Sequence, residues 1–212
     1  MPSKSRSSGR RGGTRRRAYH HGDLRQALLD AALDLLHAGG TEALTLRAVA
    51  RAVGVSQTAP YRHFADRRAL VAGVAEQAFA RMGDVITSAV RTGDPGLPAL
   101  RRGLAAYVAF AHEHPAEYRV MFGPELARRQ DLSQLGDAAV GVFSLLHDGI
   151  ERLQHAGLLG NGDSALMAIT AWATLHGLVM LSLDGQTAVT GRDLTELVDA
   201  ATGHLLKGMG AD

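Results

Sequence analysis

Three polar side chains between residues 57 and 62 have functional groups that match the edges of DNA base pairs. The amide of Gln57 and the guanidinium of Arg62 can pair with adenine or guanine edges, and Thr58 can touch a thymine methyl group. Such contacts read a sequence only when the side chains project together from one exposed element into a groove. This residue set therefore predicts direct contact with the bases of duplex DNA.

Hydroxyl groups near these side chains suit another part of the same polymer. Thr45, Ser56 and Tyr61 can each donate to a phosphate oxygen, and a helix N-terminus beside them adds N–H donors. Arg67 or Arg68, at the start of the next expected helix, can add a further contact to the DNA backbone. The segment thus predicts phosphate contacts around a small base-reading centre.

Two short helices joined by a sharp turn have to hold these residues. We expect the first helix over residues 45–53 and the second over residues 56–64, with Ser56 as the cap of the second. Gly54 supplies the permissive φ that the turn requires. Pro60 is the fourth residue of the second helix, where its missing N–H removes at most one hydrogen bond. The pattern is a helix–turn–helix whose second helix starts at an exposed surface.

The positive charge of the chain is concentrated near its N-terminus. Residues 1–70 hold 13 Lys or Arg against 5 Asp or Glu, whereas residues 71–212 hold 10 against 16. Residues 1–17 contain seven basic and no acidic residues, so we expect a disordered tail that can reach a polyanion. Two alternatives stay open at this point: a helix–turn–helix that only packs, and a basic tail on an ordinary globule.

Apolar residues recur with helical periodicity through the rest of the chain, without a convincing alternating strand or an internal repeat. The expected helices span residues 24–37, 66–90, 99–114, 131–157, 163–183 and 193–207, with a short helix starting at residue 115. The chain is therefore expected to be all-α. We expect three parts: the tail over residues 1–17, a helix–turn–helix domain over residues 18–66 and a helical bundle over residues 67–212.

The residue content excludes several chemistries. No cysteine is present, which excludes disulfides and thiol catalysis and fits a reducing cytoplasm. We find no phosphate-binding glycine loop, nucleophile elbow or carboxylate pair in an apolar setting, so we expect no enzyme activity and no cofactor. His112 and His114 lie two apart on a helix and do not face one ligand, so no metal site is expected. Neither a secretory leader nor an unbroken apolar run of membrane length is found.

Residues 163–183 are apolar on nearly every helical face. A helix that is apolar on all sides must be buried on all sides. Packing against its own bundle on one side and against a second copy on the other meets that need, with the helix over residues 193–207 adding a narrower stripe. The alternative is that residues 163–183 form the central helix of a monomer.

Aromatic, Met and His side chains recur on the helices between residues 99 and 157. They form either a packed core or the wall of a cavity for a hydrophobic or aromatic small molecule, and sequence position does not separate the two. Trp172 and His176 lie four apart and share one helical face, where a neutral imidazole can orient a polar group. The candidate ligand-binding residues are Tyr107, Phe110, Tyr118, Met121, Phe122, Phe143, His147, Trp172 and His176.

Residues 19–70 resemble the DNA-binding domain of TetR/AcrR-type regulators. The shared features are the helix over 24–37, Gly39-Gly40, Thr45-Leu-Arg-Ala-Val-Ala, Gly54-Val55-Ser56, Tyr61-Arg-His-Phe and Asp66-Arg-Arg-Ala-Leu. The resemblance implies that Phe64 anchors the second helix in the core. It implies phosphate contacts by Thr45, Ser56, Tyr61, His63 and Arg67, and base selection by Gln57, Thr58 and Arg62. Arg47, on the first helix of the motif, completes the candidate DNA-binding set.

A further resemblance concerns the C-terminal half. Trp172, His176 and Gly177 form a Trp-x-x-x-His-Gly pattern that is similar to the C-terminal domain of one TetR subgroup. The family resemblance also implies that the last two helices form the homodimer interface. The expected fold is therefore a three-helix DNA-binding domain joined by a connecting helix to a bundle for ligand binding and dimerisation.

The combined prediction is a cytoplasmic, homodimeric repressor that binds palindromic operator DNA and is released by an unknown small-molecule effector. Three alternatives remain. The first is an activator or a ligand-independent regulator. The second is an architectural DNA-binding protein that depends on its Arg-rich tail. The third is an all-α enzyme or small-molecule carrier whose helix–turn–helix only packs.

Overall fold

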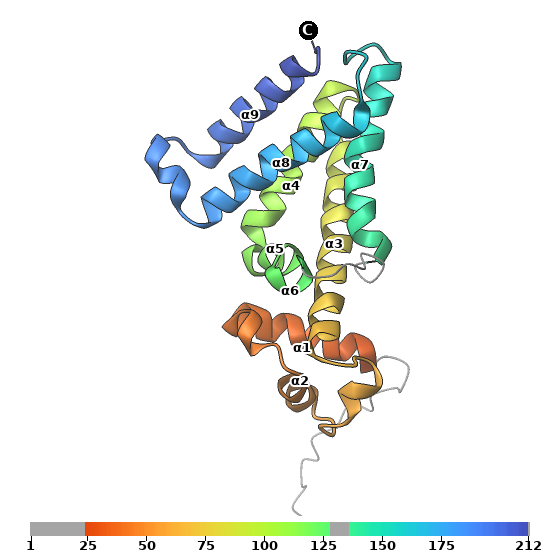
Figure 1. Ribbon diagram of the computed structural model, residues 1–212, viewed down its shortest axis with the longest axis vertical. Helices are drawn as coiled ribbons and strands as arrows, with labels where there is room; N and C mark the ends of the chain where they lie inside the picture. The colour runs from red at the N-terminus through yellow and green to blue at the C-terminus, as the bar shows by residue number, and fades with distance from the viewer. Residues whose placement is uncertain (1–23, 128–135, 212) are drawn as a thin grey trace, which may run out of the picture.

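The computed structural model describes residues 24–127 and 136–211, and these ranges contain helices and no strand. The all-α prediction is therefore confirmed. A small domain lies at one end of an elongated body and a helical bundle at the other, and helix α3 (Arg67–Arg91) joins them (Figure 1). The predicted tail over residues 1–17 and the predicted helix start at Asp131 lie outside the described residues.

The small domain packs helices α1 (Leu24–Gly39) and α2 (Leu46–Val53) against the first turns of α3. Its core is apolar, and all of the following are buried: Leu28, Leu29, Leu36, Leu44, Leu46, Val49, Phe64 and Leu70. Side chains cap both α2 and α3: Thr45 accepts a hydrogen bond from the Ala48 N–H at 3.1 Å, and Asp66 accepts one from the Ala69 N–H at 2.8 Å. Local sequence signals thus fix where both helices begin.

The second helix of the motif is shorter than the sequence predicts. Only η2 (Ala59–Arg62) is helical, and it is a 3₁₀ turn rather than an α-helix over residues 56–64. Ser56 does not cap it, since its Oγ lies 3.2 Å from the Thr58 hydroxyl. An α-helix beginning at Ser56 needs an N–H on residue 60 to bond to the Ser56 carbonyl, and Pro60 has none. The Ala59 N–H takes that acceptor instead at 3.0 Å, which is the tighter spacing of a 3₁₀ helix.

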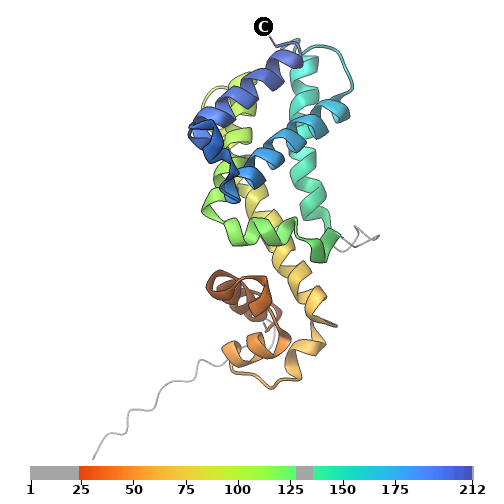
Figure 2. The same cartoon turned by 60° about the vertical axis from the view of Figure 1, so that its left-hand side comes forward.

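The bundle surrounds the later turns of α3, and α3 packs most extensively on α4 and α7. Its helices are α4 (Leu97–Glu113), α5 (Pro115–Met121), α6 (Pro124–Ala127), α7 (Gly136–His155), α8 (Ser164–Leu183) and α9 (Leu194–Gly208). Asp163 and Asp193 cap α8 and α9 through hydrogen bonds from the Leu166 and Glu196 N–H groups. A short 3₁₀ helix, η4 (Gln186–Thr190), connects α8 to α9, and both views show the chain turning between these two helices (Figures 1 and 2).

Helix α8 is apolar on all sides but is covered on one side only. Its length and hydropathy match those of a membrane span, yet it packs on α4, α7 and α9 through a buried face that includes Leu175 and Val179. The opposite face is open in the single chain, where Leu166 is 62% and Ile169 is 41% exposed. The expectation of burial on every side is therefore not met within one copy of the chain.

We predict that Gly54→Ala destabilises the protein by about 1 kcal/mol, because Gly54 has φ 77° and a non-glycine residue is strained in that region. An added Cβ would meet no atom within 4 Å, so the cost is conformational. Gly141→Ala is the matched control: Gly141 lies inside α7 with equal space, and the change should stabilise by up to about 1 kcal/mol. Urea unfolding of both variants tests this, and a neutral Gly54→Ala would mean that the turn is not left-handed.

Candidate DNA-binding surface and apolar cavity

The predicted DNA-contacting side chains gather at the free end of the small domain. The exposed members of the set are Thr45, Arg47, Ser56, Gln57, Thr58, Tyr61, Arg62 and His63. Tyr61 is 55% exposed, although large aromatic side chains are more often buried. A crevice of about 330 Å³ brings Thr45, Arg47 and Tyr61 to one place beside the start of α2. This surface offers hydroxyl, guanidinium and helix N-terminal donors together, which suits a phosphate backbone.

Arg67 differs from the other predicted members because the fold already uses its guanidinium. Nε and Nη2 donate to the Leu44 and Thr41 carbonyls at 2.7 and 2.6 Å, and Nη1 donates to Glu125 at 2.8 Å. These contacts fasten the segment before α2 to helix α6. Three of its five N–H donors are thus already engaged within the protein, so we leave Arg67 out of the proposed DNA contacts.

A cavity of about 880 Å³ runs between α3, α4, α7 and α8. Apolar side chains form most of its wall, as is usual for small-molecule sites. Five predicted ligand-binding residues line it: Tyr107, Met121, Phe122, Phe143 and Trp172. The other four, Phe110, Tyr118, His147 and His176, do not line it. Phe110 is instead a core residue that packs beside the His114 ring.

A chain of hydrogen bonds joins the cavity wall to the residues behind it. The Trp172 indole N–H donates to the Tyr107 hydroxyl at 3.1 Å, and the Tyr107 and Tyr118 hydroxyls lie 2.6 Å apart. The Tyr118 hydroxyl lies 2.7 Å from Nδ1 of His176. The donors and acceptors are all matched when the Tyr107 hydroxyl donates to Tyr118 and the Tyr118 hydroxyl donates to Nδ1 of a neutral His176. Tyr118 and His176 therefore hold Tyr107 in place from behind.

Burial keeps these three groups uncharged. It raises the pKa of Tyr107 to about 12 and raises the pKa of Tyr118 as well. Burial also lowers the pKa of His176, which favours the neutral ring that can accept from Tyr118. At neutral pH the wall therefore presents polar but uncharged atoms at this point.

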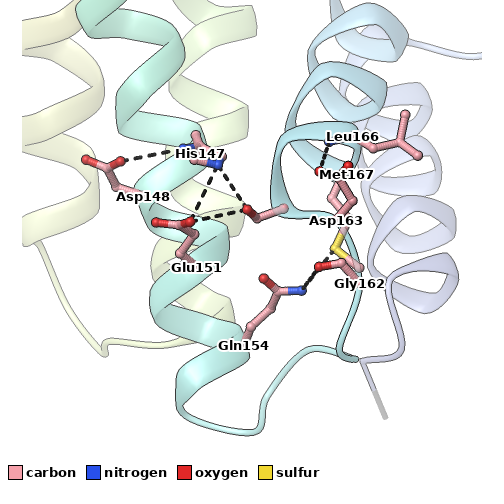
Figure 3. Close-up of polar contacts among 9 residues, drawn as sticks. His147, Asp148, Glu151, Gln154, Gly162, Asp163, Leu166 and Met167 are labelled. Carbon is pink, nitrogen blue, oxygen red and sulfur yellow. Dashed lines mark hydrogen bonds and ion pairs between the residues drawn. The ribbon is translucent and has the colours of Figure 1, made fainter.

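His147 fastens helix α8 to helix α7 (Figure 3). Its Nε2 lies 2.9 Å from the hydroxyl of Ser164, the first residue of α8, and that hydroxyl also donates to Glu151 at 3.3 Å. Asp148 and Glu151 approach different ring nitrogens of His147, at 3.8 and 3.7 Å. One ligand atom from each of the three residues lies within 4.8 Å of the others, but Nε2 of His147 is already hydrogen-bonded to Ser164. We therefore assign the cluster to helix packing.

A buried carboxylate lies at the junction of the small domain and the bundle. Glu117 of α5 is 0% exposed and pairs with Arg81 of α3. His37 of α1 lies 3.1 Å from its Oε1, and His114 lies 3.4 Å from the same atom. Three separate elements thus converge on one carboxylate. Sequence reasoning missed it because its partners at positions 37 and 81 are far away in the chain and no local spacing reveals them.

Two family descriptions match the chain. Residues 28–74 match bacterial regulatory proteins of the tetR family, and residues 100–205 match the tetracyclin repressor-like C-terminal domain. The class D tetracycline repressor protein of Escherichia coli is 38% identical over 60 residues, which is 28% of this chain and 28% of that protein. That curated relative is therefore matched over little more than a quarter of its length.

Solved structures match over most of the chain. A protein of unknown function from Rhodococcus sp. RHA1 is 34% identical, with a TM-score of 0.80, over 91% of this chain and 98% of that one. A transcriptional regulator, FadR from Bacillus subtilis in complex with stearoyl-CoA, has a TM-score of 0.69 over 86% of this chain and 98% of that one. It is 15% identical, so this second likeness shows the fold alone.

We predict that His176→Asn makes the stability less sensitive to pH between 7 and 5. Because the folded pKa of His176 is lowered, the unfolded chain takes up a proton as the pH falls through about 6.5 while the folded chain resists it. Stability from this group is therefore present at neutral pH and is lost on acidification. Asn keeps a hydrogen-bond acceptor but does not titrate. Urea unfolding of both proteins across this range measures the difference, and parallel pH profiles would refute the assignment.

Proposed function

The chain belongs to the TetR family of bacterial regulatory proteins, and we propose that it is a homodimeric repressor released from its operator by a hydrophobic small molecule. It is a DNA-binding transcription regulator, and the family and its neighbours are regulators rather than enzymes. The observation that carries the proposal is the pairing of an exposed polar surface on the small domain with a large apolar cavity, connected by the continuous helix α3. We propose that it acts in the cytoplasm.

Base reading is assigned to Gln57, Thr58 and Arg62. All three are exposed, Gln57 and Thr58 just before the short helix η2 and Arg62 at its end. Phosphate contacts are assigned to the surrounding donors, Thr45, Arg47, Ser56, Tyr61 and His63. Because η2 is only one turn long, the base-reading surface is compact and suits a few base pairs in each half-site.

Dimerisation is assigned to the open face of α8 together with α9. Exposed Leu166, Ile169 and Leu181 lie along α8, and a soluble monomer rarely exposes such a row. A second copy related by a two-fold axis would cover it with the same face. The two small domains would then read a palindromic operator.

Release requires that ligand binding in the cavity changes the position of the DNA-binding domain, and α5 contacts both. Met121 and Phe122, at the end of α5, line the cavity, whereas Glu117 at its start is paired with His37 of the small domain. A ligand that displaces α5 would therefore alter the angle between the two domains. The ligand shifts the equilibrium only by the difference between its affinities for the two arrangements.

We predict that the protein selects a palindrome from random duplexes at about 0.15 M salt. Gln57→Ala and Arg62→Ala should each relax particular positions, at a cost of about 1–3 kcal/mol for the matched base pair. Arg101→Ala removes the same charge from the exposed surface of α4 and is the control, for which the selected sequence should not change.

Other outcomes separate the alternatives. Binding without sequence preference would favour an architectural role, in which case deleting residues 1–17 should weaken binding to all DNA equally. No binding would remove the DNA-contacting roles of residues 45–63. Transcription measured with and without the protein distinguishes repression from activation, and a small molecule that never weakens operator binding counts against release.

We predict that Ile169→Glu yields monomers in sedimentation analysis and weakens operator binding, since a charge on the apolar α8 face is costly to bury without a partner. Val85→Glu is the control, because Val85 on α3 is 42% exposed, close to the 41% of Ile169, and lies outside the proposed interface. A dimer that survives Ile169→Glu would place the interface elsewhere.

A further inference from the structure

The cavity is chemically different at its two ends. Arg91, the last residue of α3, and Arg152, near the end of α7, lie at the arginine end, where α3 and α7 finish on the side away from the DNA (Figures 1 and 2). The opposite end of the cavity, next to α5, is lined by the apolar side chains of Phe79, Met121 and Phe122. Among the described residues that line the cavity, Arg91 and Arg152 carry charge and no acidic side chain is present. The wall is therefore apolar with a cationic end.

The cavity is also long. Its lining on α3 extends from Phe79 to Arg91, which at 1.5 Å per helical residue is roughly 18 Å. Gly103 lets α4 pack closely on α3, since an added Cβ would lie 3.0 Å from Val90 Cγ2. An extended apolar body fits this shape better than a compact aromatic one.

The two arginines are available to a ligand. Within residues 24–127 and 136–211, neither forms an ion pair or a side-chain hydrogen bond, whereas neighbouring Arg102 donates to the Ala89 and Asp94 carbonyls at 3.1 and 2.6 Å. The guanidinium of Arg152 lies against the wall, since a Cβ added at Gly149 would be 3.8 Å from its Nη2. Arginine at a helix C-terminus also complements the helix dipole, but that role leaves its N–H donors free.

We propose that the cavity binds an amphiphile whose one anionic group pairs with Arg91 and Arg152 and whose apolar chain extends along α3 to Phe122. This inference rests on the proposed small-molecule control and names the class of its effector. Arginine pairs with carboxylate and phosphate through two parallel hydrogen bonds, and the absence of acidic lining residues disfavours a cationic ligand. The anionic group can belong to a free carboxylic acid or to a phosphate-bearing thioester carrier.

Trp172 is the single tryptophan of the chain and lines the cavity, so its fluorescence reports binding directly. The probes are dodecanoate, dodecanol and dodecylamine, which share one chain and differ in head-group charge. Dodecanoate should bind about tenfold more tightly than dodecanol, as a charge-assisted hydrogen bond implies, and dodecylamine should bind most weakly. In the double variant Arg91→Gln, Arg152→Gln, this preference should disappear while dodecanol affinity is retained. Arg101→Gln is the control and should keep the preference.

Dodecanoyl-coenzyme A distinguishes the two sources of the anionic group. Tighter binding than dodecanoate, with a larger loss in the double variant, assigns the site to the carrier thioester, and the reverse order assigns it to the free acid. Equal affinity for the three head groups, or a preference that survives in the double variant, overturns the proposal. If dodecanoate binds with the arginine-dependent preference but leaves operator binding unchanged, the ligand class stands and the release function is refuted.

Discussion

Helix α3 constrains both halves of the molecule, because its first turns are buried in the core of the DNA-binding domain and its last turns line the cavity. Leu70 and Val74 are buried near its start, and Ile86 and Val90 face the cavity near its end. The 25 residues of α3 include Gly73 and Gly83 but no proline, and they form one uninterrupted helix that links the two halves. The DNA-binding surface and the cavity therefore cannot move independently of this helix.

The buried carboxylate of Glu117 adds a second connection beside α3. A carboxylate removed from water is costly unless opposite charges and hydrogen bonds compensate it. Here Arg81 supplies the charge, and His37 and His114 supply further polar contacts, one from each side of the domain junction. Arg67 acts similarly between Glu125 and the segment before α2. These polar contacts lie beside an apolar core that continues from the small domain into the bundle.

Local signals in the sequence were enough to predict most helix boundaries, and contacts between distant segments were not predictable. Thr45, Asp66, Asp163 and Asp193 cap the helices that follow them, and such signals are local because a capping side chain bonds to a backbone N–H only a few residues away. Pro60 was underestimated: its missing N–H falls where an α-helix would begin, so it changes the type of helix rather than removing one bond. The aromatic residues divide between the cavity wall and the core. Tyr107 lines the cavity, whereas Phe110, three residues further along α4, is a core residue, because the two side chains meet different neighbours.

Helix α5 is the element best placed to respond to the cavity. It has seven residues, and a helix of this length is not stable alone, so its position depends on its contacts. Tyr118 bonds to Tyr107 and His176 on the cavity side, while the adjacent residue Glu117 pairs with the domain junction. Allosteric coupling between two sites typically amounts to about 1–3 kcal/mol, which is comparable to one or two such hydrogen bonds. In the proposed release, a ligand would therefore need to disturb only the few polar contacts on either side of α5, while the apolar cores of both domains stay intact.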